Sequence, residues 1–287
     1  MEDGHAVHHS LQSVVLRSKV ALAVTYLGVL VFGVWILEHL SRQHAETHRY
    51  GWAVAGIFVL LAVPVSLHEI HLHALHYVSP LQRFYIRILW MVPIYSLESF
   101  LALRFKDQKE YLETMREAYE AWVVFSYFML LREYLSRRQE NLSPEQQGQC
   151  CSHLWPFKYI LTPWELGPPF ETKTLTGVYQ YVFVRTAFAI LVLLAQLVGV
   201  YGEGEWHNLY RLFVWQMIAV NLSQTWALYC LMLFYHEHHE ALLPLRPFGK
   251  FMSIKCVIFF SFWQSVLISL LAAFGVLHET HGALDYR

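Results

Sequence analysis

Long apolar segments alternate with short polar segments along almost the whole chain. Each apolar segment has about the length, roughly 20 residues, that a helix needs to cross the hydrocarbon of a bilayer. Because backbone N–H and C=O groups find no water in lipid, a helix that satisfies them internally is the natural spanning element. The pattern therefore predicts an all-α protein, a seven-transmembrane-helix bundle that forms a single integral membrane domain over residues 1–287. The predicted spans are about 20–37, 52–75, 84–105, 118–135, 178–201, 209–235 and 251–277.

The polar segments carry their own signals. The longest, residues 136–176, is rich in Pro, Gly, Gln and Ser and is predicted to be irregular with short helical pieces. Before the fourth span, Glu110, Glu113 and Glu117 are three and four residues apart, which is typical of a solvated helical face. Within the third span, Pro93 predicts a kink.

Composition agrees with a membrane protein. The chain is 56% hydrophobic and only 15% charged, which is too apolar for a soluble domain of this size. Its formal net charge of −1 and the lack of a basic block argue against nucleic acid as a partner, whereas membrane lipids are expected partners. The four cysteines do not form a disulfide framework. No ATP-binding motif is present, so the sequence predicts neither a cofactor nor pumping by hydrolysis.

Polar residues inside the apolar spans are the candidates for function. A charge in hydrocarbon costs at least a few kcal/mol on insertion scales, so such a residue normally faces the bundle interior, water or a substrate path. Glu98 lies deep in the third span. It is interpreted either as part of a path that is coupled to protons or contacts a polar group of the substrate, or as a packing carboxyl bonded to a neighbouring side chain.

The sixth span carries polar residues near its middle. Asn221 and Thr225 are four residues apart on one helical face, and Gln224 is three from Asn221, so we expect a polar stripe that faces inward. Such a stripe serves equally well as a bond between helices or as the lining of a substrate path.

Three basic residues, Arg87, Arg185 and Lys255, lie near the N-terminal ends of the third, fifth and seventh spans. Alternating topology places these ends toward one membrane face. With Arg83 they are expected to form a basic vestibule that attracts an amphipathic anion. The other interpretation is contact with lipid phosphates, which suits Arg83 and Lys255 best. The distribution of basic residues between the loops favours a cytosolic N terminus.

Histidines gather at the same predicted membrane face. Four of them have helical spacing to a carboxylate that can suit a divalent metal: His73, His76, His236 and His239. The HEIH sequence does not match the HExxH spacing of zinc proteases. Exposed histidines without a metal are therefore the default interpretation, and these four are weak metal candidates.

Three segments together carry a family resemblance. They are PLQRFYIRILWMVPIYSLESFLAL at Pro80, EAYEAWVVFSYFMLLREYL at Glu117, and the stretch from Asn221 to Gln264 that ends in FSFWQ. The chain resembles the family of the organic solute transporter alpha subunit and transmembrane protein 184. This resemblance implies a multi-pass transporter in the plasma membrane or an endomembrane, with facilitated diffusion of amphipathic organic solutes such as bile-acid or steroid-conjugate anions.

The resemblance also implies details. It places an acidic residue at Glu98, adds Gln264 as an inward polar residue, and implies a small single-span partner subunit. Cys150 and Cys151 resemble a shortened form of a Cys-rich run in the family, which predicts either S-acylation or two free thiols. The predicted substrate path consists of Glu98, Asn221, Gln224, Arg185, Arg87, Lys255 and Gln264.

Two other classes of function remain open at this point. A heptahelical receptor or membrane-trafficking scaffold would use the same bundle without transport. A metal-dependent membrane hydrolase would need the histidine clusters to converge with a carboxylate on one metal. No catalytic residue is predicted, and an enzyme is not the expected class.

Overall fold

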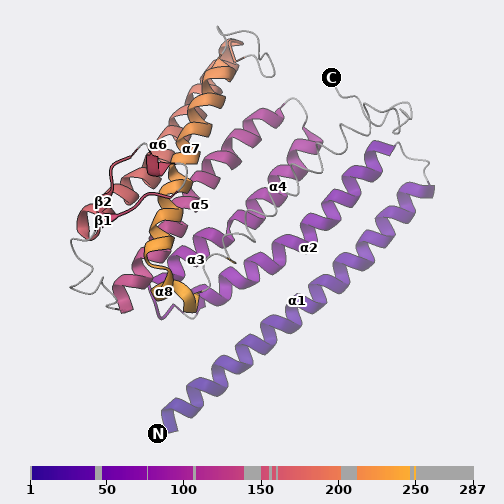
Figure 1. Ribbon diagram of the computed structural model, residues 1–287. Helices are drawn as coiled ribbons and strands as arrows, with labels where there is room; N and C mark the ends of the chain where they lie inside the picture. Colours follow the sequence, from indigo (N-terminus) through magenta and orange to yellow (C-terminus); the bar gives the residue numbers. More distant parts are fainter. Residues whose placement is uncertain are drawn as a thin grey trace. The chain divides into compact units, whose positions relative to one another are not determined.

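The computed structural model describes residues 2–42, 47–75, 77–105, 108–138, 150–154, 157–159, 161–201, 212–245 and 249, with the side chains of 2–18, 47–48 and 245 excepted. The all-α prediction is confirmed, since two strands of two residues each are the only other regular elements described apart from short 3-10 turns. Five described helices are long and apolar enough to cross a membrane (Figure 1). The count of seven spans stays a prediction, because residues 251–277, with Lys255 and Gln264, lie outside the described residues.

The contacts divide the chain into two compact units. The described residues of unit 1 lie within Met1–Gln82 and Leu89–Lys109, and those of unit 2 lie within Arg83–Ile88 and Glu110–Phe251. Each unit is built around its own packed helices. The single integral membrane domain expected over residues 1–287 stays a prediction.

Unit 1 consists of α1 (Glu2–Arg42), α2 (Thr47–Leu75) and α4 (Met91–Arg104), with α2 packed against both of the others (Figure 1). Two glycines allow the helices of unit 1 to pack closely against each other. A Cβ at Gly33 would lie 3.0 Å from Ile57, and one at Gly56 would lie 3.2 Å from Phe100. Small residues let helix backbones approach closely in membranes, where packing replaces the hydrophobic driving force between helices.

Pro64 lies inside α2 and removes one backbone donor from the helix. In the preceding turn the Leu61 carbonyl accepts a hydrogen bond of 2.8 Å from the Tyr26 hydroxyl of α1. The carbonyl that loses its helical donor to Pro64 is that of Leu60, four residues back, so the bond from Tyr26 lies one residue away from the interruption.

The kink predicted at Pro93 is a break one turn earlier. Helix α3 (Leu81–Leu89) ends before Trp90, and α4 begins at Met91. Proline has no N–H to donate to the carbonyl four residues back, and its ring collides with that carbonyl, which here belongs to Leu89. Helical bonding resumes with the 3.2 Å bond from Ile94 N–H to the Trp90 carbonyl.

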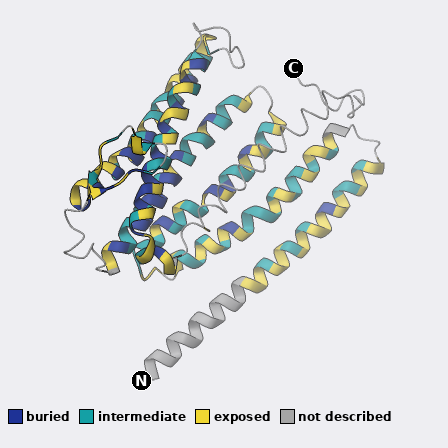
Figure 2. Cartoon of the chain, in the orientation of Figure 1, coloured by how far each residue is buried: buried dark blue, intermediate teal, exposed yellow. Residues whose placement is uncertain are grey.

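Unit 2 contains most of the buried core of the described residues (Figure 2). Its long helices are α5 (Lys109–Arg138), α6 (Pro168–Val198) and α7 (Leu212–Glu237), followed by the short α8 (His239–Leu242) and a 3-10 turn, Leu243–Leu245. Aromatic side chains fill the space between α5, α6 and α7. The largest fully buried aromatic side chains are Phe128, Phe170 and Phe234.

Helix α5 contains the predicted span 118–135 but begins nine residues earlier, at Lys109, and is not one of the five strongly apolar helices. Helix α6 begins ten residues before the predicted start at 178. Its first turn holds Pro168 and Pro169, whose fixed φ suits the start of a helix, after Gly167 at φ 122°. The residues 168–176, expected to be irregular, are therefore helical.

Helices α6 and α7 approach each other closely at Gly177. An ideal Cβ there would lie 2.4 Å from the Cys230 sulfur and 3.2 Å from Trp226 Nε1. Both distances are shorter than van der Waals contact, so only glycine fits this position without moving its neighbours. The close approach fixes the register of α6 against α7 at this point.

Candidate functional site

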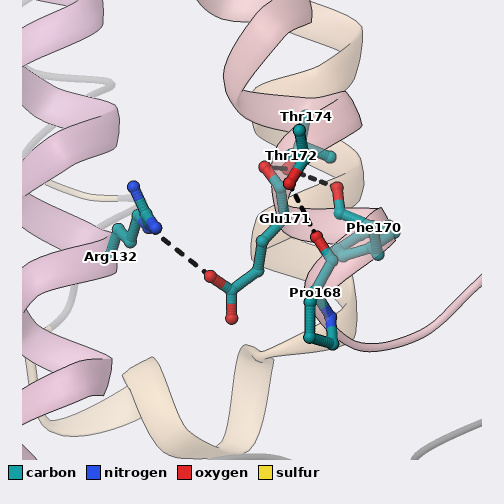
Figure 3. Close-up of polar contacts among 6 residues, drawn as sticks. All are labelled: Arg132, Pro168, Phe170, Glu171, Thr172 and Thr174. Atoms are coloured by element: carbon teal, nitrogen blue, oxygen red, sulfur yellow. Dashed lines mark hydrogen bonds and ion pairs between the residues drawn. The ribbon is translucent and has the colours of Figure 1, made fainter.

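Polar side chains join α5 to α6 at three levels. Arg132 pairs with Glu171 at 3.4 Å, Arg185 forms an ion pair with Glu117, and Gln196 donates a 2.7 Å hydrogen bond to Glu110. Residues later in α6 pair with residues earlier in α5, so the two helices run antiparallel. Figure 3 shows the first level, where Glu171 in the first turn of α6 points toward Arg132. A carboxylate in a first helical turn is favoured by the helix dipole.

The middle pair, Arg185 and Glu117, is less exposed to water than the Arg132–Glu171 pair. The side chain of Arg185 is 12% exposed and that of Glu117 is 36% exposed, whereas Arg132 and Glu171 are 41% and 40% exposed. Arg185 lies midway along α6, within a helix apolar enough to span a membrane. The attraction between opposite charges rises as the effective dielectric falls, so this pair interacts more strongly than the outer one.

The partner of Arg185 corrects one expectation. Glu110 and Glu117 were expected on a solvated face of their helix, but both face α6. They are seven residues apart, which is close to two helical turns and puts both on one side of α5. The prediction that Glu110 and Glu117 share a helical face is therefore correct. The predicted solvated environment was wrong, because Gln196 and Arg185 of α6 lie opposite these two residues.

A second polar contact joins α6 to α7. The Gln180 side chain donates to the Ser223 carbonyl at 2.9 Å and accepts from the Ser223 hydroxyl at 2.9 Å. Ser223 is therefore the buried polar residue of this stretch, while Asn221 and Thr225 are exposed. Both side chains bond to their own helix, Asn221 to the Met217 carbonyl and Thr225 to that of Asn221. Gln224 is half-buried, and its lining role with Asn221 stays a prediction.

Glu98 is buried in α4 and accepts a 3.3 Å hydrogen bond from Ser99. It belongs to unit 1, whereas Arg87, Arg185, Asn221 and Gln224 belong to unit 2. The predicted path residues are therefore divided between the units, and their use in one path stays a prediction. Arg87 is exposed on α3, and its carbonyl accepts a 2.6 Å hydrogen bond from the Tyr119 hydroxyl of α5.

Sequence reasoning missed a docked segment in the long polar connection. Strand β1 (Cys150–Cys151) pairs antiparallel with β2 (Trp164–Glu165), and a 3-10 turn, Phe157–Tyr159, lies between them. His153 holds this segment on α7: Nδ1 lies 2.6 Å from the Tyr229 hydroxyl and Nε2 lies 2.8 Å from the Thr162 carbonyl. A carbonyl only accepts, so Nε2 donates to Thr162.

The two adjacent cysteines have different environments. Cys150 is exposed, whereas Cys151 is buried, and its thiol donates to Glu237 Oε1 at 3.1 Å. Burial raises the pKa of the Cys151 thiol from 9.0 to about 12, with added contributions from the hydrogen bond to Glu237 and from its charge. Since the thiolate is the nucleophile, these environments favour Cys150 for acylation, which stays a prediction for both residues.

Alkylation tests this difference. At pH 8, well below its raised pKa, the Cys151 thiol stays almost fully protonated, with only about one part in ten thousand as thiolate. We expect N-ethylmaleimide to modify Cys150 of the folded protein within minutes and Cys151 far more slowly, as followed by mass spectrometry of the peptide that contains both. Denatured protein serves as the control, in which both cysteines react at similar rates. Equal rates in the folded protein would contradict the buried environment of Cys151.

The histidine candidates do not form a metal site within the described residues, where no group of three His, Cys, Asp or Glu side chains is placed to hold an ion. His73 is half-buried on α2, in unit 1, while His236 and His239 are exposed in unit 2. His76 lies outside the described residues.

Long apolar helices with polar side chains paired between them define the class of protein as a multi-pass helical membrane protein. Residues 51–286 match the family model of the organic solute transporter Ostalpha, and the chain belongs to this family.

Curated relatives support the family assignment. The chain is 30% identical over 263 residues to protein LAZ1 homolog 1 of Arabidopsis thaliana, covering 86% of this chain and 54% of that protein. It is 30% identical to LAZ1 homolog 2 of the same plant, covering 83% of this chain and 62% of that protein. It is 34% identical to vacuole membrane protein hfl11 of Schizosaccharomyces pombe, covering 79% and 54%. The chain thus spans just over half the length of these relatives. No solved structure matches it significantly.

Proposed function

We propose that this protein moves amphipathic organic anions, of the bile-acid or steroid-conjugate type, across a membrane by facilitated diffusion. Family membership supports movement of an organic solute. The observation that carries the proposal is the Arg185–Glu117 ion pair, which lies partly buried between α5 and α6 in the middle of an apolar helix.

The pair suits anion passage for a chemical reason. A charged residue inside a membrane helix is costly and is typically found where a substrate or ion passes. A buried ion pair adds little to stability, because desolvation offsets much of the attraction. A solute carboxylate or sulfate can take the place of Glu117 on the Arg185 guanidinium, so that the cation keeps an oxyanion partner throughout the exchange.

The other residues of the proposed path have separate roles. Glu98, buried in α4, would contact a polar group of the solute or a coupled proton, and Asn221 and Gln224 on α7 would line the path. Arg87 would lie at the entrance, with Lys255 and Gln264 contributing from outside the described residues. The relative named vacuole membrane protein hfl11 supports an endomembrane location, and a single-span partner subunit is part of the proposal.

The test is uptake of labelled taurocholate and of a steroid sulfate into proteoliposomes that hold this chain. We expect saturable uptake by the wild type and an initial rate roughly tenfold lower or more in Glu98→Gln and in the double variant Arg185→Leu/Glu117→Leu, equivalent to about 1.4 kcal/mol in the barrier. The double variant removes both charges of this pair together, so neither Arg185 nor Glu117 is left without the other. Arg132→Leu/Glu171→Leu is the matched control from the exposed pair and should stay within about twofold of wild type.

Three results would contradict parts of the proposal. Full uptake by the folded Arg185→Leu/Glu117→Leu variant would exclude the pair from the path. Loss in the Arg132→Leu/Glu171→Leu control to the same extent would mean that any change between α5 and α6 disturbs uptake. No uptake by folded wild type, with and without an added single-span subunit, would replace transport with a receptor or scaffold role.

A further inference from the structure

Helix α3 presents two arginines around one buried aromatic ring. Arg83 and Arg87 are one turn apart, and Phe84 lies between them. The Arg83 guanidinium carbon lies 4.6 Å from the Phe84 ring centre, and that of Arg87 lies 5.9 Å from the same ring and 5.7 Å from the ring of Trp122 on α5. Cation–π contacts of this kind hold the guanidinium groups over the rings instead of letting them extend freely into water.

Neither arginine has an acidic partner among the described residues of the chain. On α5, Glu117 binds Arg185. Two like charges four residues apart on a helix repel each other. An oxyanion between them would remove the repulsion and accept hydrogen bonds from both planar guanidinium groups.

An aromatic row continues from the arginines across unit 2. The Trp122 ring lies 5.6 Å from Phe125, and Phe125 lies 5.5 Å from Tyr179 of α6, edge to face. Trp122 is 37% exposed and Tyr179 is 51% exposed, so the row offers apolar surface that the described core does not cover. Rigid flat rings lose little conformational entropy when they take up a rigid apolar ligand.

We propose that Arg83 and Arg87 bind the oxyanion headgroup of an amphipathic solute whose rigid apolar body lies along Trp122, Phe125 and Tyr179. Charge complementarity selects the headgroup, and the aromatic row selects the body. The solute class rests on the proposed function, but the site itself rests on the contacts within unit 2. This site is separate from the Arg185–Glu117 pair, and it binds solute before passage.

Binding is tested on the full chain in nanodiscs of zwitterionic phosphatidylcholine, with dehydroepiandrosterone sulfate as the probe and its uncharged parent steroid as the comparison. Quenching of tryptophan fluorescence and isothermal titration report the dissociation constants. In the double variant Arg83→Gln/Arg87→Gln we expect the dissociation constant of the sulfate to rise at least tenfold and that of the uncharged steroid to stay unchanged. Trp122→Leu should weaken the binding of both ligands, and Arg132→Gln is the control that changes neither.

Other outcomes would overturn the site. Unchanged affinity for the sulfate in Arg83→Gln/Arg87→Gln would exclude the arginines as the headgroup site. Loss of sulfate binding when anionic phosphatidylglycerol is added to the nanodisc at fixed ionic strength would assign the arginines to a phospholipid headgroup instead. Uptake measured on the same variants separates this site from the transport proposal. If the wild type binds the solute but shows no uptake, the transport proposal is wrong and the binding site is unaffected. If the wild type shows uptake and the double variant Arg83→Gln/Arg87→Gln binds the sulfate as tightly as wild type, the binding site is wrong and the transport proposal is unaffected.

Discussion

Replacing Arg185 by leucine is expected to lower the free energy of unfolding by about 2 kcal/mol, because Glu117 is then left as a partly buried charge without its ion-pair partner on α6. Glu117→Leu should have a similar effect, since it leaves the 12% exposed Arg185 guanidinium without this carboxylate. The double variant Arg185→Leu/Glu117→Leu should lie closer to wild type than either single variant. The measurement is a double-mutant cycle of chemical unfolding in detergent micelles.

The more exposed Arg132–Glu171 pair provides the control for this cycle. Its side chains are 41% and 40% exposed, and the atoms of the pair are 3.4 Å apart, so each single variant should cost at most about 1 kcal/mol. A coupling energy for Arg185 and Glu117 no larger than that of this outer pair would contradict the partly buried, low-dielectric environment assigned to the middle of α6.

Replacing His153 by alanine is expected to release the segment 150–165 from α7. The ring is buried and makes two hydrogen bonds, to the Tyr229 hydroxyl and to the Thr162 carbonyl, and it packs edge to face against Trp164 at 4.9 Å. Losing the ring leaves a cavity and two polar groups without their partner, together worth about 2–4 kcal/mol of local stability.

Limited proteolysis of the segment measures this effect. When the segment opens and closes rapidly, the cleavage rate follows the population of the open form, so about 3 kcal/mol corresponds to a rate roughly a hundredfold higher. Tyr229→Phe, which removes only the hydroxyl, should cost about 1 kcal/mol. Tyr159→Ala, at an 83% exposed position in the same segment, is the control and should not alter cleavage. Equal cleavage of wild type and His153→Ala would show that His153 does not hold the segment.

The helices were largely predictable because a long apolar run leaves the backbone few alternatives in lipid. The predicted helix ends were wrong where the hydrophobicity of the sequence does not mark the point at which the backbone begins or leaves a helix. The start of α6 lies in polar sequence, and its signal was the proline pair at Pro168, which is typical of a first helical turn. The break before Met91 was displaced from Pro93 because proline acts on the carbonyl four residues earlier.

The candidate site was less predictable, for a different reason. Helical spacing shows which residues share a face, as it did for Glu110 and Glu117, but it carries no information about which helix lies opposite. The pairing of Glu117 with Arg185 depends on the antiparallel register of α5 and α6. His153 lies in a segment without periodicity, so its contact with Tyr229 across 76 positions of sequence left no pattern to detect.

The close approach at Gly177 limits how the helices of unit 2 can move. A shift of α6 along α7 by one turn, about 5.4 Å, would bring a residue with a side chain to the place where even one added carbon would lie 2.4 Å from the Cys230 sulfur. Sliding between these two helices is therefore blocked at this point by steric exclusion. Conformational changes in this protein are therefore expected to keep the register of α6 against α7 at Gly177, and a cross-link between the two helices at this point should leave such changes intact.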